Sequence, residues 1–148
     1  MTDKSIKTGA AKIDCPTFEN PAFVKDVALE KATVAIVTSA SLHHSTDDDF
    51  APVDIGYRVL ERERRDIVVG HWSPNFDASG VSADLNVVFP IDRLEELAER
   101  GVIGCVSDVH LAYAGNQFDL AGVRMDSGPA GAQLLKDNEV DAVLLTPV

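Results

Sequence analysis

The sequence is poor in cysteine and lacks the common motifs of nucleotide and hydrolase sites. Its 148 residues include two cysteines, Cys15 and Cys105, which lie far apart and form no Cys-x-x-Cys pair. This spacing excludes a thioredoxin-type motif and a zinc knuckle visible in the sequence. There is also no Gly-x-Gly-x-x-Gly segment, no P-loop and no Gly-x-Ser-x-Gly elbow. Dinucleotide, nucleoside triphosphate and α/β-hydrolase sites therefore lack their usual support.

Basic residues are also scarce: 13 lysines and arginines stand against 24 acidic residues, which gives a formal net charge of −11. A surface this negative repels phosphate backbones and anionic lipid, so neither nucleic acid nor membrane is an expected partner. The main basic cluster, Arg62, Arg64 and Arg65, alternates with acidic residues and predicts a solvated charged face.

Long apolar runs are absent as well, and none approaches the roughly 20 residues that a membrane-spanning helix needs. The polar start of the chain is not a secretory signal, and nothing points to export. We therefore expect a cytoplasmic protein with two free thiols, and Cys105, which lies in an apolar run, is expected in the core. Residues 1–14 are predicted to form a loose N-terminal arm, and residues 15–148 a single domain.

What the sequence does contain is an alternation of strand and helix patterns. Short apolar runs rich in β-branched residues predict strands at 32–39, 66–70, 101–106 and 140–148. One helix is predicted from a capping box at Asp92 and Glu95 to Gly101, and another from Ser127 with a proline in its first turn. A third is predicted from Cys15-Pro16 through Phe23. This order predicts an α/β fold with a mostly parallel sheet flanked by helices.

Histidines follow three of the predicted strands, and ligands of such sheets bind at the carboxyl ends of strands. They are His43 with His44, His71, and His110. With nearby aspartates they supply nitrogen and oxygen ligands for a transition metal, although their spacing matches no compact ligand motif. A metal-dependent enzyme that uses these four histidines is one interpretation. The other is that they cap loops and satisfy buried backbone groups.

A polar stretch with Asp84, Asn86 and Arg93 surrounds an apolar turn before the helix predicted near Asp92. One interpretation is local: Asp84 and Asn86 form loop hydrogen bonds, and Arg93 pairs with an acid on the helix. The other is a polar shelf for a carboxylate substrate, with Arg93 as its bidentate partner. The chemistry of these residues leaves both open.

One block of the sequence is distinctive, and it contains His71-Trp72, Asp84-x-Asn86-x-Val88-Phe89-Pro90-Ile91-Asp92-Arg93-Leu94 and Gly101-x-Ile103-Gly104. Supporting matches are Val37-Thr38-Ser39-Ala40-Ser41-Leu42-His43, Asp54 and Arg58. Together they resemble the glycine/sarcosine/betaine/D-proline reductase selenoprotein B family over roughly 32–148. The segment 110–115 departs from the family pattern, so the subfamily stays open.

The resemblance implies a reactive residue outside this sequence. In the family, a strand similar to 141–148 is followed at once by selenocysteine or cysteine, so we expect that the chain stops just before its nucleophile. It is then incomplete at its C-terminus, contains no cofactor and is inactive as it stands, with selenocysteine expected in the full-length form. Apolar surface on the last strand would favour a homo-oligomer.

The activity implied by the resemblance is reductive cleavage of a carbon–nitrogen bond in a small amino-acid-like substrate. A selenolate or thiolate is the nucleophile, and a dithiol or thioredoxin-like protein supplies the electrons. A subunit with a pyruvoyl group is an implied partner. The residues expected to line the site are His43, His71, Asp84, Asn86, Arg93 and His110. A non-catalytic substrate-binding or assembly subunit is the alternative, beside the metal-dependent enzyme.

Overall fold

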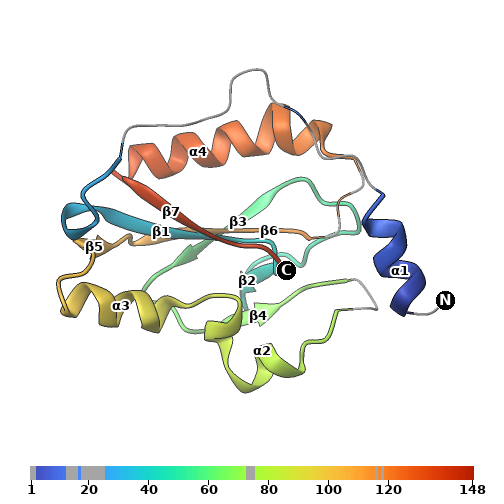
Figure 1. The fold of residues 1–148 in the computed structure, drawn as a ribbon, viewed down its shortest axis with the longest axis horizontal. Coiled ribbons are helices and arrows are strands. Elements are labelled where there is room, and N and C mark those ends of the chain that lie inside the picture. Colours follow the sequence, from blue (N-terminus) through green and yellow to red (C-terminus); the bar gives the residue numbers. More distant parts are fainter. Residues whose placement is uncertain (1–2, 13–16, 18–25, 73–75, 116, 118) are drawn as a thin grey trace.

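The computed structural model describes residues 3–12, 17, 26–72, 76–115, 117 and 119–148 (Figure 1). Its main sheet is built around β1 (Thr33–Thr38), which is parallel to β5 (Cys105–Val106), β6 (Val109–Tyr113) and β7 (Ala142–Thr146). β3 (Tyr57–Glu61) pairs antiparallel with β6 and completes the sheet. A second, small sheet joins β2 (Leu42–His44) antiparallel to β4 (Ile67–Val69). The predicted α/β fold with a mostly parallel sheet is confirmed.

The helices cover the sheet on both faces, with α4 (Gly128–Asp137) above it and α3 (Ile91–Glu99) below it in Figure 1. The remaining helical elements are α1 (Asp3–Ala10), α2 (Ser79–Ala83) and the short turns η1 (Leu29–Lys31), η2 (Leu85–Val87) and η3 (Val123–Ser127). α1 lies within the segment predicted as a loose arm. No helix in the described ranges is both long enough and apolar enough to cross a membrane.

The core follows from the alternation of side chains along β1. Ile36 points toward the α3 face, where it joins Phe89 and Leu94 in the larger apolar cluster. Ala35 points the other way and packs with residues of β6 and α4, among them Leu135. β1 is thus buried on both faces, which is why its sequence is a continuous apolar run without alternating polar residues.

The strand predictions at 32–39 and 140–148 are confirmed as β1 and β7. The run 66–70 contains β4, but β4 belongs to the small sheet. The run 101–106 supplies only β5, because its first residues close α3. There Gly101 has φ +69°, its N–H donates to the Ala98 carbonyl, and Val102 N–H donates to the Leu97 carbonyl, a Schellman ending that favours glycine.

Two local predictions are corrected. The N-cap of α3 is Pro90 instead of Asp92, so the capping box does not form. Cys105 is exposed instead of buried, and its thiol donates to the Thr33 hydroxyl over 3.3 Å. α4 begins after Ser127 with a proline in its first turn, as predicted. The helix predicted from Cys15-Pro16 through Phe23 lies almost wholly outside the described residues.

Candidate functional site

Side-chain hydroxyls tie together the carboxyl ends of β1 and β7. Thr38 Oγ1 donates to the Thr146 carbonyl over 3.2 Å, and Val148 N–H donates to Ser39 Oγ over 2.9 Å. Thr146 Oγ1 donates in turn to the Val88 carbonyl over 2.8 Å, which brings the segment between η2 and α3 to the same edge. This edge is where parallel sheets place their ligands. We call it the carboxyl edge.

The turn between β1 and β2 completes the carboxyl edge from the side of β6. Ser41 is fully buried and has φ +53°, a conformation that is uncommon outside glycine. Its hydroxyl accepts a hydrogen bond from Gly115 N–H over 3.3 Å, and its carbonyl accepts one from Gly70 N–H over 2.8 Å. One strained residue therefore connects the end of β1 with the segments that follow β6 and β4.

His71, one of the residues expected to line the site, lies beside Gly115 at this edge. Its ring stacks on Phe76, with 4.2 Å between centroids and 14° between planes. A Cβ atom on Gly115 would lie 2.9 Å from His71 Nε2 and 2.7 Å from the Ser39 carbonyl oxygen, so only glycine fits there without displacing either group. Burial lowers the pKa of His71, and the imidazole is therefore neutral at neutral pH.

His43 lies in β2 instead of a loop, which corrects the prediction, and is packed beneath Gly70, the residue before His71. Its Nδ1 lies 2.9 Å from the His44 carbonyl oxygen and its Nε2 lies 3.4 Å from Asp49 Oδ1. Its ring is buried and meets Phe50 edge-on. His43 therefore supports the carboxyl edge through its contact with Gly70.

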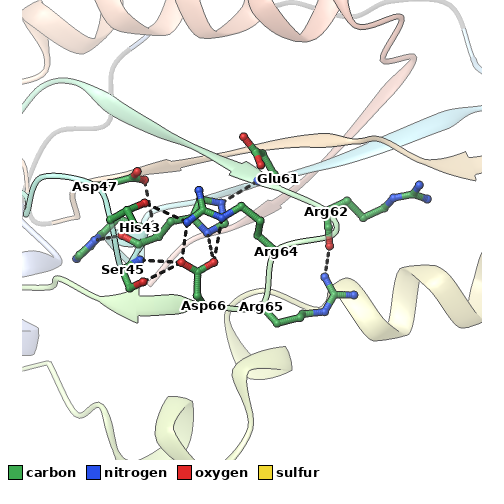
Figure 2. A network of polar contacts seen from close by, with 10 residues as sticks. His43, Ser45, Asp47, Glu61, Arg62, Arg64, Arg65 and Asp66 are labelled. Atoms are coloured by element: carbon green, nitrogen blue, oxygen red, sulfur yellow. Dashed lines mark hydrogen bonds and ion pairs between the residues drawn. The ribbon is translucent and has the colours of Figure 1, made fainter.

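His44 contacts a charged network instead of the carboxyl edge. Its Nε2 accepts a hydrogen bond from Glu61 N–H over 3.0 Å, and its Nδ1 lies 3.2 Å from Asp66 Oδ1. Figure 2 shows Arg64 and Ser45 converging on the same Asp66 carboxylate. Hydrogen bonds from Arg64 hold the pKa of Asp66 well below its usual range.

The three arginines of the basic cluster are all paired within the chain. Arg64 binds Asp66 at 2.6 Å, while the other two pair elsewhere: Arg62 with Asp108 at 2.9 Å and Arg65 with Glu95 at 3.0 Å. Their positive charges are therefore balanced locally at the protein surface. This is the solvated charged face that the sequence predicts.

His110 lies inside the sheet, in β6, which again corrects its expected place in a loop. It is fully buried, and its Nδ1 accepts a hydrogen bond from Ile36 N–H over 2.9 Å. β1 pairs with β5 through Val34 and with β6 from Val37, so the imidazole serves a backbone donor in the gap between them. Burial, together with nearby arginine charge, lowers the pKa of His110 to about 4.

Asp84 and Asn86 form a local network with Asp92. Asn86 Nδ2 donates to Asp84 Oδ1 over 3.0 Å and to Asp92 Oδ2 over 2.8 Å. Asn86 Oδ1 accepts from Asp92 N–H over 3.2 Å, and so it caps the first turn of α3. Arg93 is exposed and pairs with Glu96 at 2.9 Å. The local interpretation accounts for all of these contacts.

The sequence of the chain matches a known protein family. Residues 10–148 match the family model described as glycine/sarcosine/betaine reductase selenoprotein B. The chain belongs to this selenoprotein B family. The match covers nearly the whole sequence and confirms the resemblance.

Two kinds of curated relative of this chain stand out. D-proline reductase subunit gamma of Acetoanaerobium sticklandii is 35% identical over 121 residues, which are 80% of this chain and 49% of the relative. Glycine reductase complex component B subunit gamma is 32% identical both in Carboxydothermus hydrogenoformans, over 91% of this chain and 32% of the relative, and in Symbiobacterium thermophilum, over 83% and 29%. The chain thus spans half or less of the length of these relatives. No solved structure matches it significantly.

The structure brings together only part of the predicted site. His71 lies at the carboxyl edge with His43 behind it, while His44 and His110 serve backbone donors elsewhere. Among the described residues, no group of three or more histidines, cysteines or acids is close enough to hold a metal ion. The interpretation that histidines satisfy buried backbone groups therefore fits His44 and His110.

Sequence reasoning missed the hydroxyl groups of the carboxyl edge. Thr38 and Ser39 end one apolar run, and Thr146 ends the other. A hydroxyl residue at the carboxyl end of each of two predicted parallel strands was a usable signal, because such ends meet at one edge of the sheet. Gly115 and the strained Ser41 carry no comparable signal, since their roles depend on contacts between distant segments.

Proposed function

We propose that this chain forms part of the catalytic subunit of a selenol- or thiol-dependent reductase that cleaves a carbon–nitrogen bond in a small amino-acid-like substrate. The proposal rests on membership of the selenoprotein B family and on relatives named as D-proline reductase and glycine reductase subunits. Its electrons come from a dithiol, which is oxidised to a disulfide as the carbon–nitrogen bond is reduced.

The observation that carries the proposal is the hydrogen bond from Val148 N–H to Ser39 Oγ at 2.9 Å. It fixes the backbone after β7 at the carboxyl edge. A selenocysteine or cysteine directly after Val148 would start from this point and supply the nucleophile. The surroundings fit such a residue, because they combine fixed hydroxyls with a histidine whose lowered pKa keeps it neutral at neutral pH.

We propose different roles for the residues at this edge. Ser39 and Thr38 hold the ends of β1 and β7 together. The backbone from which the reacting residue would follow therefore has a fixed position. We assign proton transfer to His71, because a neutral imidazole accepts a proton near neutral pH. Asp84 and Asn86 act indirectly: their network holds η2, whose end contacts Thr146. We propose no role for Arg93 at the carboxyl edge, because it is exposed and pairs with Glu96.

The partners in this proposal follow from the chemistry. A dithiol or thioredoxin-like donor must reach the carboxyl edge, and a subunit with a pyruvoyl group is proposed to present the amino substrate. Two of the relatives are named as subunits of a glycine reductase complex, which supports assembly with other subunits. Because dithiol donors persist in reducing compartments, we propose the cytoplasm as the location.

The test begins with the gene. The codon after that of Val148 is expected to be UGA, with a reading frame that continues beyond it. The extended protein with cysteine at that position, assayed with dithiothreitol and D-proline, glycine, betaine or sarcosine, should reduce one of them when its partner subunits are present, and the matched alanine version should not. An ordinary stop codon with no continuing frame would contradict the proposal and favour a non-catalytic binding subunit.

A further inference from the structure

Arg58, on β3, binds the loop that joins β2 to β3. Its Nε donates to the Asp48 carbonyl over 3.1 Å, and its Nη2 donates to the Asp49 carbonyl and to Asp54 Oδ2, each over 3.2 Å. The guanidinium also lies over the Phe50 ring, 4.3 Å from its centroid. The side chains of Arg58 and Asp54 are 21% and 19% exposed, so their charge-assisted contact is partly shielded from water. A single side chain therefore holds this loop at several points along its length.

The same loop lies against His43. Phe50 meets the His43 ring edge-on, with 6.3 Å between centroids, and Asp49 Oδ1 lies 3.4 Å from His43 Nε2. Arg58 contacts the Phe50 ring and the backbone of Asp49, so it determines where the two residues that contact His43 lie. The position of the buried His43 ring therefore depends on Arg58.

Gly70 connects His43 to His71, which follows it in the chain. A Cβ atom on Gly70 would lie 2.9 Å from His43 Cδ2 and 3.2 Å from the Ser41 carbonyl oxygen, so the backbone passes close to both groups. The Gly70 N–H donates to that same oxygen over 2.8 Å. The backbone from which the His71 side chain extends is thus held between Ser41 and His43.

Two further observations indicate that Arg58 acts on the loop and does not bind a ligand itself. Its Nη1 donates to the Tyr57 carbonyl over 3.4 Å, so all three of its nitrogens are already used within the chain. Val53 has φ +58°, a strained conformation for a β-branched residue, which persists only where surrounding contacts hold the chain. The next residue, Asp54, supplies such contacts through Arg58 and through Gln117, whose Nε2 donates to the Asp54 carbonyl over 2.7 Å.

We propose that Arg58 is a positioning residue for His71. It holds the loop between β2 and β3 against His43, and His43 fixes the backbone that precedes His71. This role needs the planar guanidinium, because a lysine ammonium can pair with Asp54 but cannot also bind two carbonyl groups and cover an aromatic ring. Its importance for catalysis rests on the proposed function, in which His71 transfers a proton.

The test follows the titration of His71 by NMR in the 148-residue chain, with the signal assigned by comparison with His71→Gln. Burial lowers the pKa of His71, so a ring that is less firmly placed meets more water and its pKa rises toward 6.5. Arg58→Lys and Arg58→Gln should both raise it by about half a pH unit, although only the second removes the positive charge. The same two changes at Arg62, which follows β3 and pairs with Asp108, should leave it unchanged.

Phe50→Leu extends the test, because it loosens the contact with His43 and leaves every charge in place. It should raise the pKa of His71 in the same direction, and it keeps the question answerable if the Arg58 variants fail to fold. A rise in Arg58→Gln without one in Arg58→Lys would overturn the proposal, because charge and not placement would then act on His71. An unchanged His71 in Phe50→Leu would also overturn it.

These measurements need no reductase activity. A full-length enzyme that reduced none of the proposed substrates would contradict the proposed function, while a response of His71 to the Arg58 and Phe50 variants would still show that Arg58 places this ring.

Discussion

Acidification should destabilise this protein through His110. In the folded chain the imidazole is fully buried and accepts a hydrogen bond from Ile36 N–H, and burial lowers its pKa from 6.5 to about 4. In the unfolded chain the pKa returns to its ordinary value. Between pH 6.5 and 4 the unfolded state therefore binds more protons, and stability falls as the pH falls. A shift of this size corresponds to about 3 kcal/mol over that window.

Two substitutions separate the proton from the hydrogen bond. His110→Gln keeps an oxygen that can accept from Ile36 N–H but does not titrate, so its stability should lose this part of the pH dependence. His110→Leu also removes the titration and leaves a buried N–H without an acceptor, which should cost about 1–3 kcal/mol already at pH 7. Neither variant changes the carboxylates that titrate in the same range.

The assay is urea unfolding followed by the fluorescence of Trp72 at several values between pH 7 and pH 4. The free energy of unfolding of the natural chain should fall by about 3 kcal/mol more than that of His110→Gln across this range. The reasoning would be refuted if the two proteins lost stability in parallel, because His110 would then have the same pKa folded and unfolded.

Three further outcomes are expected. Gly115→Ala should destabilise the chain by about 1–3 kcal/mol in thermal unfolding, because the added Cβ meets both the Ser39 carbonyl and the His71 ring; a stability unchanged within error would contradict this packing. Asn86→Ala should cost about 1 kcal/mol by removing the cap of α3, whereas the control Arg93→Ala should cost less than about 0.5 kcal/mol; equal effects would show that the cap contributes nothing. Ser39→Ala should speed amide exchange after β7, and unchanged exchange there would show that this hydroxyl does not hold the edge.

The elements that were predictable are those that a local sequence pattern marks. β1 and β7 are both continuous apolar runs; β1 is largely buried, as such a run indicates, whereas β7 is half-buried or exposed along its length. The Gly101 ending of α3 was equally readable, because a left-handed residue after a helix is usually glycine. These features depend on neighbours in the sequence.

The elements that were missed depend on partners far away in the sequence. β2 and β6 contain histidines, which made them look like loops, yet each histidine that serves a backbone donor does so on another strand: His44 serves Glu61, and His110 serves Ile36. The cap of α3 likewise comes from Asn86, outside the helix, where a local capping box was expected. Periodicity contains no information about such contacts, because a side chain that replaces a backbone acceptor obeys no spacing rule.

The central position of β1 has a consequence for how the protein folds. β1 is made early, yet Thr33 N–H donates to a carboxylate of Asp141, which lies 108 residues further along the chain. At synthesis rates of about 5–20 residues per second, β1 is made several seconds before β7, the strand that pairs with it. Such long-range parallel pairing is slow to form, and the apolar run of β1 is meanwhile open to incorrect pairing. Yield in a foreign host should therefore respond to temperature and chaperone supply more strongly than the stability of the finished fold would suggest.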